Sequence, residues 1–383
     1  MSVESRLRPW WEERTEEEQR VTALIVGFVS LVAVMLALNP IDAITPVPLP
    51  TLSLAFVIST LAIAGMYLLL TLGLNVQWGY AGLVNFSVVA FWGIGAYSGA
   101  LLTGAGSPHE LELHPLYALV LAILLSVVLA VAIGLPTLRL RADYLAIATL
   151  GFSEIIRIII LNEEWLTAGG LGVGGMPTLV TTWPSELFTP LLDPLADVLG
   201  TQTRTLHDLV FIMAIAVVVF FILRRTQISP WGRVLRTIRA DEDIARALGK
   251  NTYWYKMQAF VLGCVIMAIA GWYYAHHVRF VTPAQLDPID TFYIWVAVIL
   301  GGSGSNRGAI LGGFTVVVIL QGTRLYSDTI DAILFFMTID ESALRLLLVG
   351  LLVIVVVRLR PEGILPPQRE HIWPSALNDR EER

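Results

Sequence analysis

Few residues in this sequence have types and spacings that could support catalysis. The chain contains no Gly-x-x-x-x-Gly-Lys-Ser/Thr loop that would cradle a phosphate, so it brings no ATPase motif of its own. His276 and His277 are adjacent, which places them on different helix faces or at a helix end, and without nearby cysteines or carboxylates they make a poor metal site. No spacing suggests a Ser/His/Asp triad. The sequence gives little support to an enzyme and predicts no bound cofactor.

The segment 225–256 combines many cations with the residues of a short helix. Asp241 can cap that helix, Glu242 suits its first turn, Ala245 is a good helix former, and Gly249 is a natural stop. The predicted helix presents two apolar residues on one face, Ile244 and Leu248. An amphipathic helix of this kind suits docking into a groove on another protein. An ordinary solvated loop is an equally good interpretation.

The elements that must position these residues are indicated by composition. The 383 residues are 56% hydrophobic and 15% charged, whereas a soluble domain is usually about 45–50% apolar and about 25% charged. Ten apolar segments occur near 22–39, 53–74, 81–103, 115–136, 143–161, 206–224, 257–277, 290–303, 308–322 and 343–359. The eighth and ninth are short for full spans and could be tilted, partly buried or a re-entrant pair. The sequence predicts an all-α, polytopic membrane protein with about ten transmembrane helices.

The placement of Lys and Arg predicts the orientation, because cytoplasmic loops are enriched in these residues. Taking all ten segments as spans puts five basic clusters on one side: Arg6, Arg8, Arg14 and Arg20; Arg139 and Arg141; Arg224, Arg225, Arg233, Arg236, Arg239, Arg246, Lys250 and Lys256; Arg307; and Arg358 and Arg360. The loops on the other side hold few basic residues. Nine or eleven spans would break this agreement, so both termini are expected in the cytoplasm.

The predicted organisation has three parts. Residues 1–20 form a cytoplasmic tail, residues 21–360 form the membrane domain, and residues 361–383 form a second cytoplasmic tail. Within the membrane domain, 225–256 is a cytoplasmic loop and 162–205 is a long outer loop rich in glycine and proline.

Four polar side chains in or beside the predicted spans are further candidates. Glu154 and Arg157 lie three residues apart near the middle of a span, where an unpaired charge is costly and where this spacing allows pairing on one helix face. The pair either lines a pathway or gate, or is a structural ion pair between helices. Asn85 and Ser87 could contact a zwitterionic substrate or bridge helices, and bridging is slightly favoured.

Six stretches, together with the loop around 241–250, carry a resemblance to a known family. The stretches are Gly73-Leu-Asn-Val-Gln-Trp-Gly-Tyr-Ala-Gly-Leu-Val-Asn-Phe-Ser87, Ala90-Phe-Trp-Gly-Ile-Gly-Ala-Tyr97, Leu138 to Arg157, Leu166-Thr-Ala-Gly-Gly-Leu-Gly-Val173, Leu300-Gly-Gly-Ser-Gly-Ser-Asn-Arg-Gly308 and Arg360-Pro-Glu-Gly-Ile-Leu365. They cover most of residues 60–365 in the family's order and resemble the LivM type of branched-chain amino acid permease. The loop resembles the Glu-Ala-Ala loop of ABC-importer membrane subunits, with Glu242, Ala245 and Gly249 at matching places.

This resemblance implies a division of labour in the plasma membrane of a prokaryote. The chain would form part of the pathway for leucine, isoleucine, valine or related amino acids. A second, related permease would complete the pathway, an extracytoplasmic solute-binding protein would deliver the substrate, and cytoplasmic ATP-binding subunits would bind and hydrolyse ATP. The residues Asp241, Glu242, Ala245 and Gly249 would then belong to the coupling helix that rests on an ATP-binding subunit.

Departures from the family pattern bear on the substrate. Residues 85–88 read Asn-Phe-Ser-Val where the family often has Ser-Leu-Gly-His, and Ala-Gly-Gly-Leu-Gly follows Thr167 where Gly-Gly-Pro-x-Gly is usual. A permease of the same family for urea or a short amide is therefore an alternative. An ion-coupled secondary transporter and a membrane scaffold without transport activity are alternatives of other classes.

Overall fold

The computed structural model describes residues 54–179, 203–333, 341–359 and 362–367. The chain divides into two units: one comprises Met1–Val57 and Leu320–Leu347, and the other comprises Ile58–Ile319 and Leu348–Arg383. All residues considered below for function belong to the second, larger unit.

Helices dominate the described residues. In chain order the elements are α2 (Leu54–Leu74), the π-helical turn η3 (Asn75–Tyr80), α3 (Val88–Thr103), α4 (Pro115–Thr137), α5 (Ala142–Asn162), α6 (Glu164–Thr167), the 3₁₀ turn η4 (Gly169–Leu171), β1 (Val173–Gly174), α9 (Thr203–Ile228), α10 (Pro230–Ala240), α11 (Glu242–Ala247), α12 (Thr252–Val278), β2 (Phe280–Val281), the 3₁₀ turn η7 (Pro283–Leu286), α13 (Pro288–Gly301), α14 (Asn306–Ile333) and α15 (Glu341–Leu359).

Five of the described helices are long and apolar enough to cross a membrane. They are α2 with η3, α4, α5, α9 and α12. Helices α3 and α13 are apolar but shorter. The predicted all-α, multi-pass architecture is therefore confirmed, with one two-residue strand pair added. The first predicted span, 22–39, lies outside the described residues, and the count of ten remains a prediction.

Two predicted segments, the third and the ninth, differ from the structure. The third, predicted at 81–103, begins as a helix only at Val88, because residues 82–87 are irregular. The eighth is α13, which is short at 14 residues, as expected. The ninth is not short, since it lies within the 28 residues of α14. The sequence interpretation stopped near residue 322 because the polar residues that follow, including Arg324, interrupt the apolar pattern.

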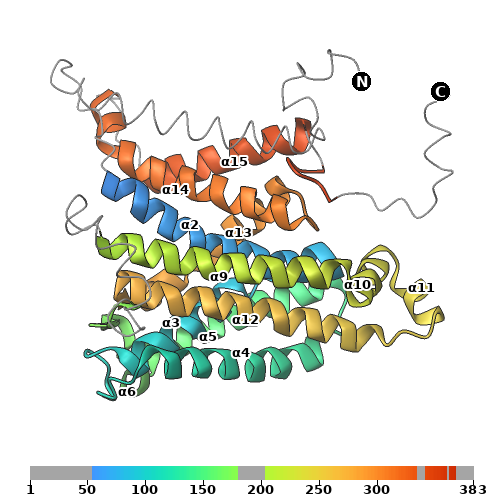
Figure 1. Ribbon diagram of the computed structural model, residues 1–383, viewed down its shortest axis with the longest axis horizontal. Helices are drawn as coiled ribbons and strands as arrows, with labels where there is room; N and C mark the ends of the chain where they lie inside the picture. The colour runs from blue at the N-terminus through green and yellow to red at the C-terminus, as the bar shows by residue number, and fades with distance from the viewer. Residues whose placement is uncertain (1–53, 180–202, 334–340, 360–361, 368–383) are drawn as a thin grey trace, which may run out of the picture. The chain divides into compact units, whose positions relative to one another are not determined.

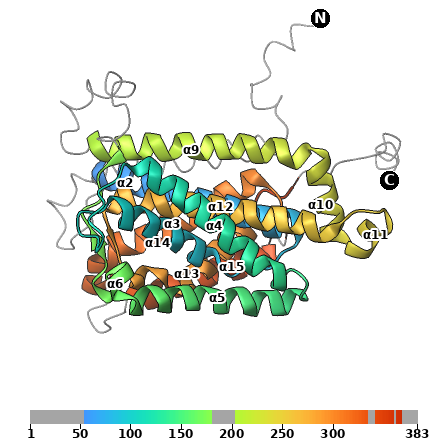
Figure 2. The same ribbon diagram turned by 90° about the horizontal axis from the view of Figure 1, so that it is seen from below.

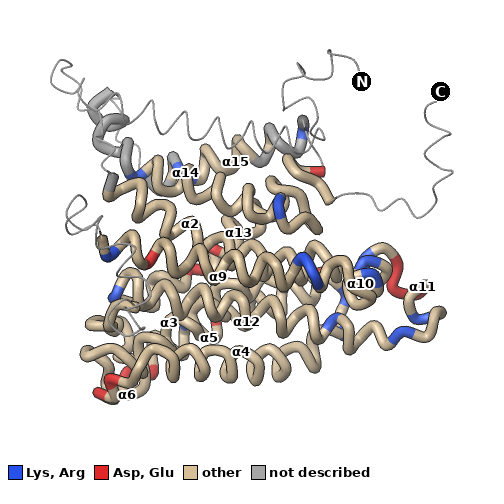
Figure 3. The backbone as a smooth tube through the Cα atoms, viewed as in Figure 1, with Lys and Arg blue, Asp and Glu red and all other residues tan. Residues whose placement is uncertain are grey.

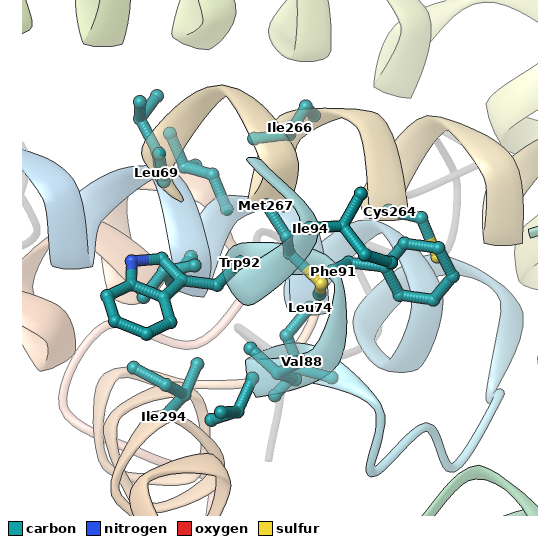
Figure 4. Packing of buried hydrophobic residues seen from close by; sticks show 14 of the residues in the cluster. Leu69, Leu74, Val88, Phe91, Trp92, Ile94, Cys264, Ile266, Met267 and Ile294 are labelled. Carbon is teal, nitrogen blue, oxygen red and sulfur yellow. The ribbon is translucent and has the colours of Figure 1, made fainter. Parts of the chain in front are cut away.

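The core of the larger unit forms where α3 packs against α12 and α4 (Figure 1). Nearly every residue of α3 is buried. A Cβ on Gly95 would lie 1.9 Å from the Ala268 carbonyl oxygen, and one on Gly271 would lie 1.8 Å from that of Trp92. Only glycine permits this backbone approach. Around it, larger side chains such as Phe91 and Met267 fill the space between the helices (Figure 4).

Helix α4 has one small-residue face and one large apolar face. The small residues recur every four positions and are buried: Ala118, Ala122, Ser126, Ala130 and Gly134. The opposite face exposes Tyr117, Val120, Leu124 and Val128. Since small residues let membrane helices pack closely, the first face contacts neighbouring helices and the second suits lipid. Figure 2 shows α9 and α5 on opposite sides of α4.

A strand pair closes the end of the unit opposite to α10 and α11. Strands β1 and β2 are antiparallel, with Val173 opposite Val281. They join the part of the predicted outer loop that the structure describes to the connection after α12. Residues 180–202 of that loop lie outside the described residues.

Candidate functional site

Helices α10 and α11 project beyond the end of α9 (Figure 1). The sequence interpretation missed α10, because its many arginines read as a loop. It begins at Pro230, after Ser229 accepts a hydrogen bond from the Gly232 amide at 3.4 Å. Proline suits the first helical position and serine suits the cap. Figure 3 shows Lys and Arg concentrated around α10, α11 and the start of α12.

Helix α11 confirms the predicted short helix. The Asp241 carboxylate accepts hydrogen bonds from the amides of Asp243 and Ile244, at 2.9 and 3.1 Å. Gly249 follows the helix with a φ of +74°, in the left-handed region where glycine is unstrained. The side chains of Ile244 and Leu248 are 55% and 68% exposed. The helix thus offers a small apolar surface to solvent or a partner.

Ala245 and Glu242 attach α11 to the rest of the unit. Ala245 is buried within the hydrophobic core. The Glu242 carboxylate accepts a hydrogen bond from Thr252 at 2.8 Å, pairs with Arg246 at 2.7 Å, and pairs with Lys256. Burial alone would raise the pKa of this carboxyl, but the hydrogen bonds from Lys256 and Thr252 and the nearby positive charges lower it overall. Glu242 is therefore held as a carboxylate that joins α11 to α12.

Arg239 connects α10 to two irregular segments of the unit. Its guanidinium donates hydrogen bonds to the Gly79 carbonyl at the end of η3 and, at 3.0 Å, to the Ser303 hydroxyl in the loop before α14. Burial lowers the pKa of Arg239 below its usual value. Sequence reasoning counted this residue only as a loop cation, since its partners lie 160 and 64 positions away.

A buried polar network continues from these segments. The Asn75 Oδ1 atom accepts from the Gly304 amide at 2.7 Å, and the Asn75 Nδ2 atom donates to Asn306 Oδ1 at 3.0 Å. Gln227, at the end of α9, donates to the Gly304 carbonyl at 2.9 Å. The two segments that meet Arg239 are thus bonded to each other and to α9 and α14 as well.

Asn85 and Ser87 are buried in the irregular segment before α3. Asn85 donates to Gln77 Oε1 at 2.8 Å, and its own Oδ1 accepts from the Ser87 amide at 2.8 Å. The Trp295 ring nitrogen donates to the Asn85 carbonyl at 3.0 Å. These contacts fit the bridging interpretation, because both side chains are fully buried and bonded within the unit.

Gln77 links the same segment to the only cysteine of the chain. Its Nε2 atom donates to the Phe260 carbonyl at 2.8 Å and lies 3.4 Å from the Cys264 sulfur. The Cys264 side chain is fully buried in α12.

Glu154 and Arg157 form the predicted pair on α5. The Arg157 Nε and Glu154 Oε2 atoms are 2.8 Å apart, and the second contact of this bidentate pair is 2.5 Å. The two side chains are 39% and 30% exposed, and the neighbouring Ile155 and Ile158 are also exposed. The pair therefore lies on an outer surface of this unit and is not enclosed between its helices.

His276 and His277 have separate partners near the far end of α12. His276 is buried and lies 3.3 Å from the Thr103 hydroxyl. His277 pairs with Asp208 of α9 at 3.0 Å. Within the part of the chain that the structure describes, no cluster of three or more His, Cys, Asp or Glu side chains could hold a metal ion.

Similarity to known proteins identifies the family to which this architecture belongs. Residues 56–357 match the family described as branched-chain amino acid transport system, permease component. The chain is 31% identical over 315 residues to the high-affinity branched-chain amino acid transport system permease protein LivM of Salmonella typhimurium, covering 80% of this chain and 69% of the relative. It is 26% identical to the probable LivM protein of Methanocaldococcus jannaschii, covering 79% and 91%.

A more distant similarity involves a second type of permease. The chain is 25% identical over 276 residues to the LivH permease protein of Salmonella typhimurium, covering 69% of this chain and 83% of the relative. No solved structure matches the chain. The family match over more than half of the chain, the LivM relatives and the membrane-spanning helices agree: this chain belongs to the family of branched-chain amino acid transport system permease components.

Proposed function

We propose that this chain is a permease subunit of an ATP-driven importer that brings leucine, isoleucine, valine or a related amino acid into the cell. The names of the LivM relatives support this substrate class over urea or a short amide. Helix α11 is the observation that carries the mechanism. It projects from the unit, is capped by Asp241 and is held to α12 by Glu242. A rigid helix outside the spans can transmit a movement of an attached subunit to the helices within the membrane.

The partners follow from what the chain lacks and what it exposes. Its sequence has no phosphate-binding loop, so separate ATP-binding subunits would supply the energy and dock on Ile244 and Leu248 of α11. The similarity to LivH as well as LivM supports a second, related permease. An extracytoplasmic solute-binding protein would deliver the substrate. In this arrangement both termini and α11 face the cytoplasm, as the basic clusters predict.

The candidate polar residues have different roles in this proposal. The partly exposed pair Glu154 and Arg157 would face the second permease and line the pathway between the two subunits. Charged side chains in spans are usually paired and border a polar route. Asn85 and Ser87 would hold the start of α3 in place instead of binding substrate.

Reconstitution of the whole transporter tests the proposal. The chain is assembled in liposomes with its ATP-binding subunits, partner permease and binding protein, and uptake of labelled leucine and of urea is measured with and without ATP. We expect leucine uptake that requires ATP and every subunit. Urea uptake without leucine uptake would overturn the substrate class. Leucine uptake by this chain alone under an ion gradient would overturn the ATP-driven mechanism.

Variants of the exposed face of α11 test the docking role. Ile244→Ala combined with Leu248→Ala should weaken capture of the ATP-binding subunits at least tenfold, because two apolar anchors are removed. The control is Val217→Ala combined with Ile222→Ala, which removes exposed apolar atoms from α9 at 52% and 51% exposed positions. Equal capture by both variants would place the docking surface elsewhere.

A further inference from the structure

A basic cavity lies beside α11, where α4 ends and α5 and α12 begin. Its volume is about 650 Å³, and it is lined by the turn between α4 and α5, the end of α11 and the first residues of α12. The charged residues in its wall are Arg139, Arg141, Arg246, Lys250, Lys256 and Glu242. Five cations and one carboxylate meet in one concave space. This excess of positive charge predicts an anionic ligand.

The ion pairs of the wall leave much of this charge available. Glu242 neutralises part of the positive charge of Arg246 and Lys256. Among the described residues, Arg141 and Lys250 have no carboxylate partner within ion-pair distance. Arg139 lies over the Tyr253 ring, with its guanidinium carbon 5.4 Å from the ring centroid. The Tyr253 hydroxyl in turn donates to the Leu135 carbonyl at 3.1 Å. Arg139 is therefore held in the wall, and no carboxylate of the described residues pairs with it.

The position of the cavity indicates how deep in the membrane its ligand would lie. Three membrane-spanning helices, α4, α5 and α12, begin or end at its wall. Exposed aromatic side chains follow wall residues closely in the sequence: Tyr144, three residues after Arg141, is 62% exposed, and Trp254, next to Tyr253, is 54% exposed. Tyrosine and tryptophan are enriched where spans meet the headgroup layer. Leu140, in the wall itself, is also exposed. This combination of cations, aromatic residues and exposed apolar surface is typical of the headgroup level of a membrane.

We propose that this cavity binds the phosphate of an anionic phospholipid from the adjacent leaflet. Basic pockets between membrane helices on the cytoplasmic side are suited to such headgroups. The cavity differs from the proposed docking face of α11, because Ile244 and Leu248 are not in its wall. The lipid headgroup would join the α4–α5 turn to the start of α12, next to the carboxylate that holds α11.

The experiment measures lipid retention by the purified full chain. Native mass spectrometry compares phosphatidylglycerol with phosphatidylcholine of identical acyl chains. We expect a preference for phosphatidylglycerol that falls about fivefold for each wall cation removed, and so about 25-fold in the double variant Arg141→Gln, Lys250→Gln. The control is Arg224→Gln combined with Arg225→Gln, which removes two exposed cations at the end of α9, outside the cavity.

The outcomes separate the possible ligands. An equal loss in both double variants would show general surface charge and overturn the site. Complete displacement of phosphatidylglycerol by millimolar inorganic phosphate would show a free-anion site and overturn the lipid assignment. In the reconstituted transporter, loss of the ATP-binding subunits from the wall variant, with lipid retention by its purified chain unchanged, would assign the cavity to protein docking instead. The variant Arg141→Lys, Lys250→Arg keeps the charge and should keep the preference, which excludes misfolding as the cause.

Discussion

Glu242 shows how one side chain can join two helices. In the sequence it is a favourable first-turn acid, but in the structure it also bonds Thr252 and Lys256 at the start of α12. A hydrogen bond to a charged group contributes about 1.5–3 kcal/mol, and less where solvent reaches it. The residue therefore holds α11 against α12 as well as beginning the helix.

Glu242→Gln should loosen α11 without unfolding the protein. The neutral amide keeps the size of the side chain and loses both ion pairs, so amides of α11 should exchange about tenfold faster with deuterium, measured by mass spectrometry. Asp243→Asn is the control, because its carboxylate is 90% exposed and pairs only with Arg246 among the described residues. Equal exchange in the two variants would contradict the joining role.

The same residue predicts an acid dependence. The pKa of Glu242 is lower in the folded protein than in the unfolded chain. Its stabilising effect is therefore complete above the unfolded pKa, about 4.3, and is lost as the pH falls through the folded pKa. Protection factors for α11, corrected for intrinsic exchange rates, should fall below pH 4 in the native chain. In Glu242→Gln the protection should already be low and should change little with pH.

Arg239 is predicted to be needed for transport but not for folding and insertion. Arg239→Ala removes hydrogen bonds to the Gly79 carbonyl and the Ser303 hydroxyl, so the link from α10 to η3 and to the loop before α14 is lost. In the reconstituted transporter, leucine uptake per ATP hydrolysed should fall at least fivefold while the protein still inserts. Arg233→Ala is the control on the same helix, since among the described residues the Arg233 guanidinium bonds only the nearby Ile228 carbonyl. An unchanged ratio of leucine uptake to ATP hydrolysis in Arg239→Ala would exclude a role for this link in transport.

At the scale of elements, α3 and α12 behave as one body. Their backbones meet at Gly95 and Gly271, where a single added carbon would overlap a carbonyl oxygen. Interfaces packed this tightly do not slide by small steps. We therefore expect α3 and α12 to move together in any rearrangement during transport, with the irregular segments around them absorbing the change.

Gly271→Ala should destabilise this helix pair strongly. Its Cβ would lie 1.8 Å from the Trp92 carbonyl oxygen, and overpacking of this kind costs about 1–3 kcal/mol or more. Gly151→Ala on α5 is the control, because its Cβ would meet no atom of the described residues within 4 Å. Thermal unfolding in detergent, followed by size-exclusion chromatography, should show a lower midpoint for Gly271→Ala and an equal or higher one for Gly151→Ala.

For the whole molecule, the charge pattern predicts which side of the membrane each loop faces. A fluorescent protein fused after Gly249 should fluoresce in the cytoplasm, and alkaline phosphatase fused after His109 should be active outside, because the loop 104–114 holds no Lys or Arg. Exchanging the two reporters should abolish both signals. Active phosphatase at Gly249 would reverse the proposed orientation.

Much of this architecture was predictable from local sequence signals. Spans such as α4 and α12 follow from long apolar runs, and α11 follows from Asp241 and Gly249, whose effects act within a few residues. The pairing of Glu154 with Arg157 also follows from their spacing of three. These features need no knowledge of distant parts of the chain.

The remaining features depend on contacts between distant residues. The π-helical turn η3 is bonded to Gly304 and Asn306, which lie 229 and 231 positions from Asn75. The arginines of α10 resemble those of a solvated loop in the sequence, and only the fold brings Arg239 to Gly79 and Ser303. Likewise, the late start of α3 depends on Asn85 bonding Gln77 and Trp295. Such pairings are set by the packed fold and leave no periodic pattern in the sequence.

The enclosed sulfur of Cys264 has a practical consequence. As the sole cysteine of the chain, fully buried beside Gln77, it should not react with maleimide reagents while the protein stays folded. The native chain is thus already a suitable background for site-directed labelling. A new cysteine at Asp243, which is 90% exposed on α11, would carry the only spin label, so changes in its mobility could be followed through the ATP cycle without first replacing Cys264.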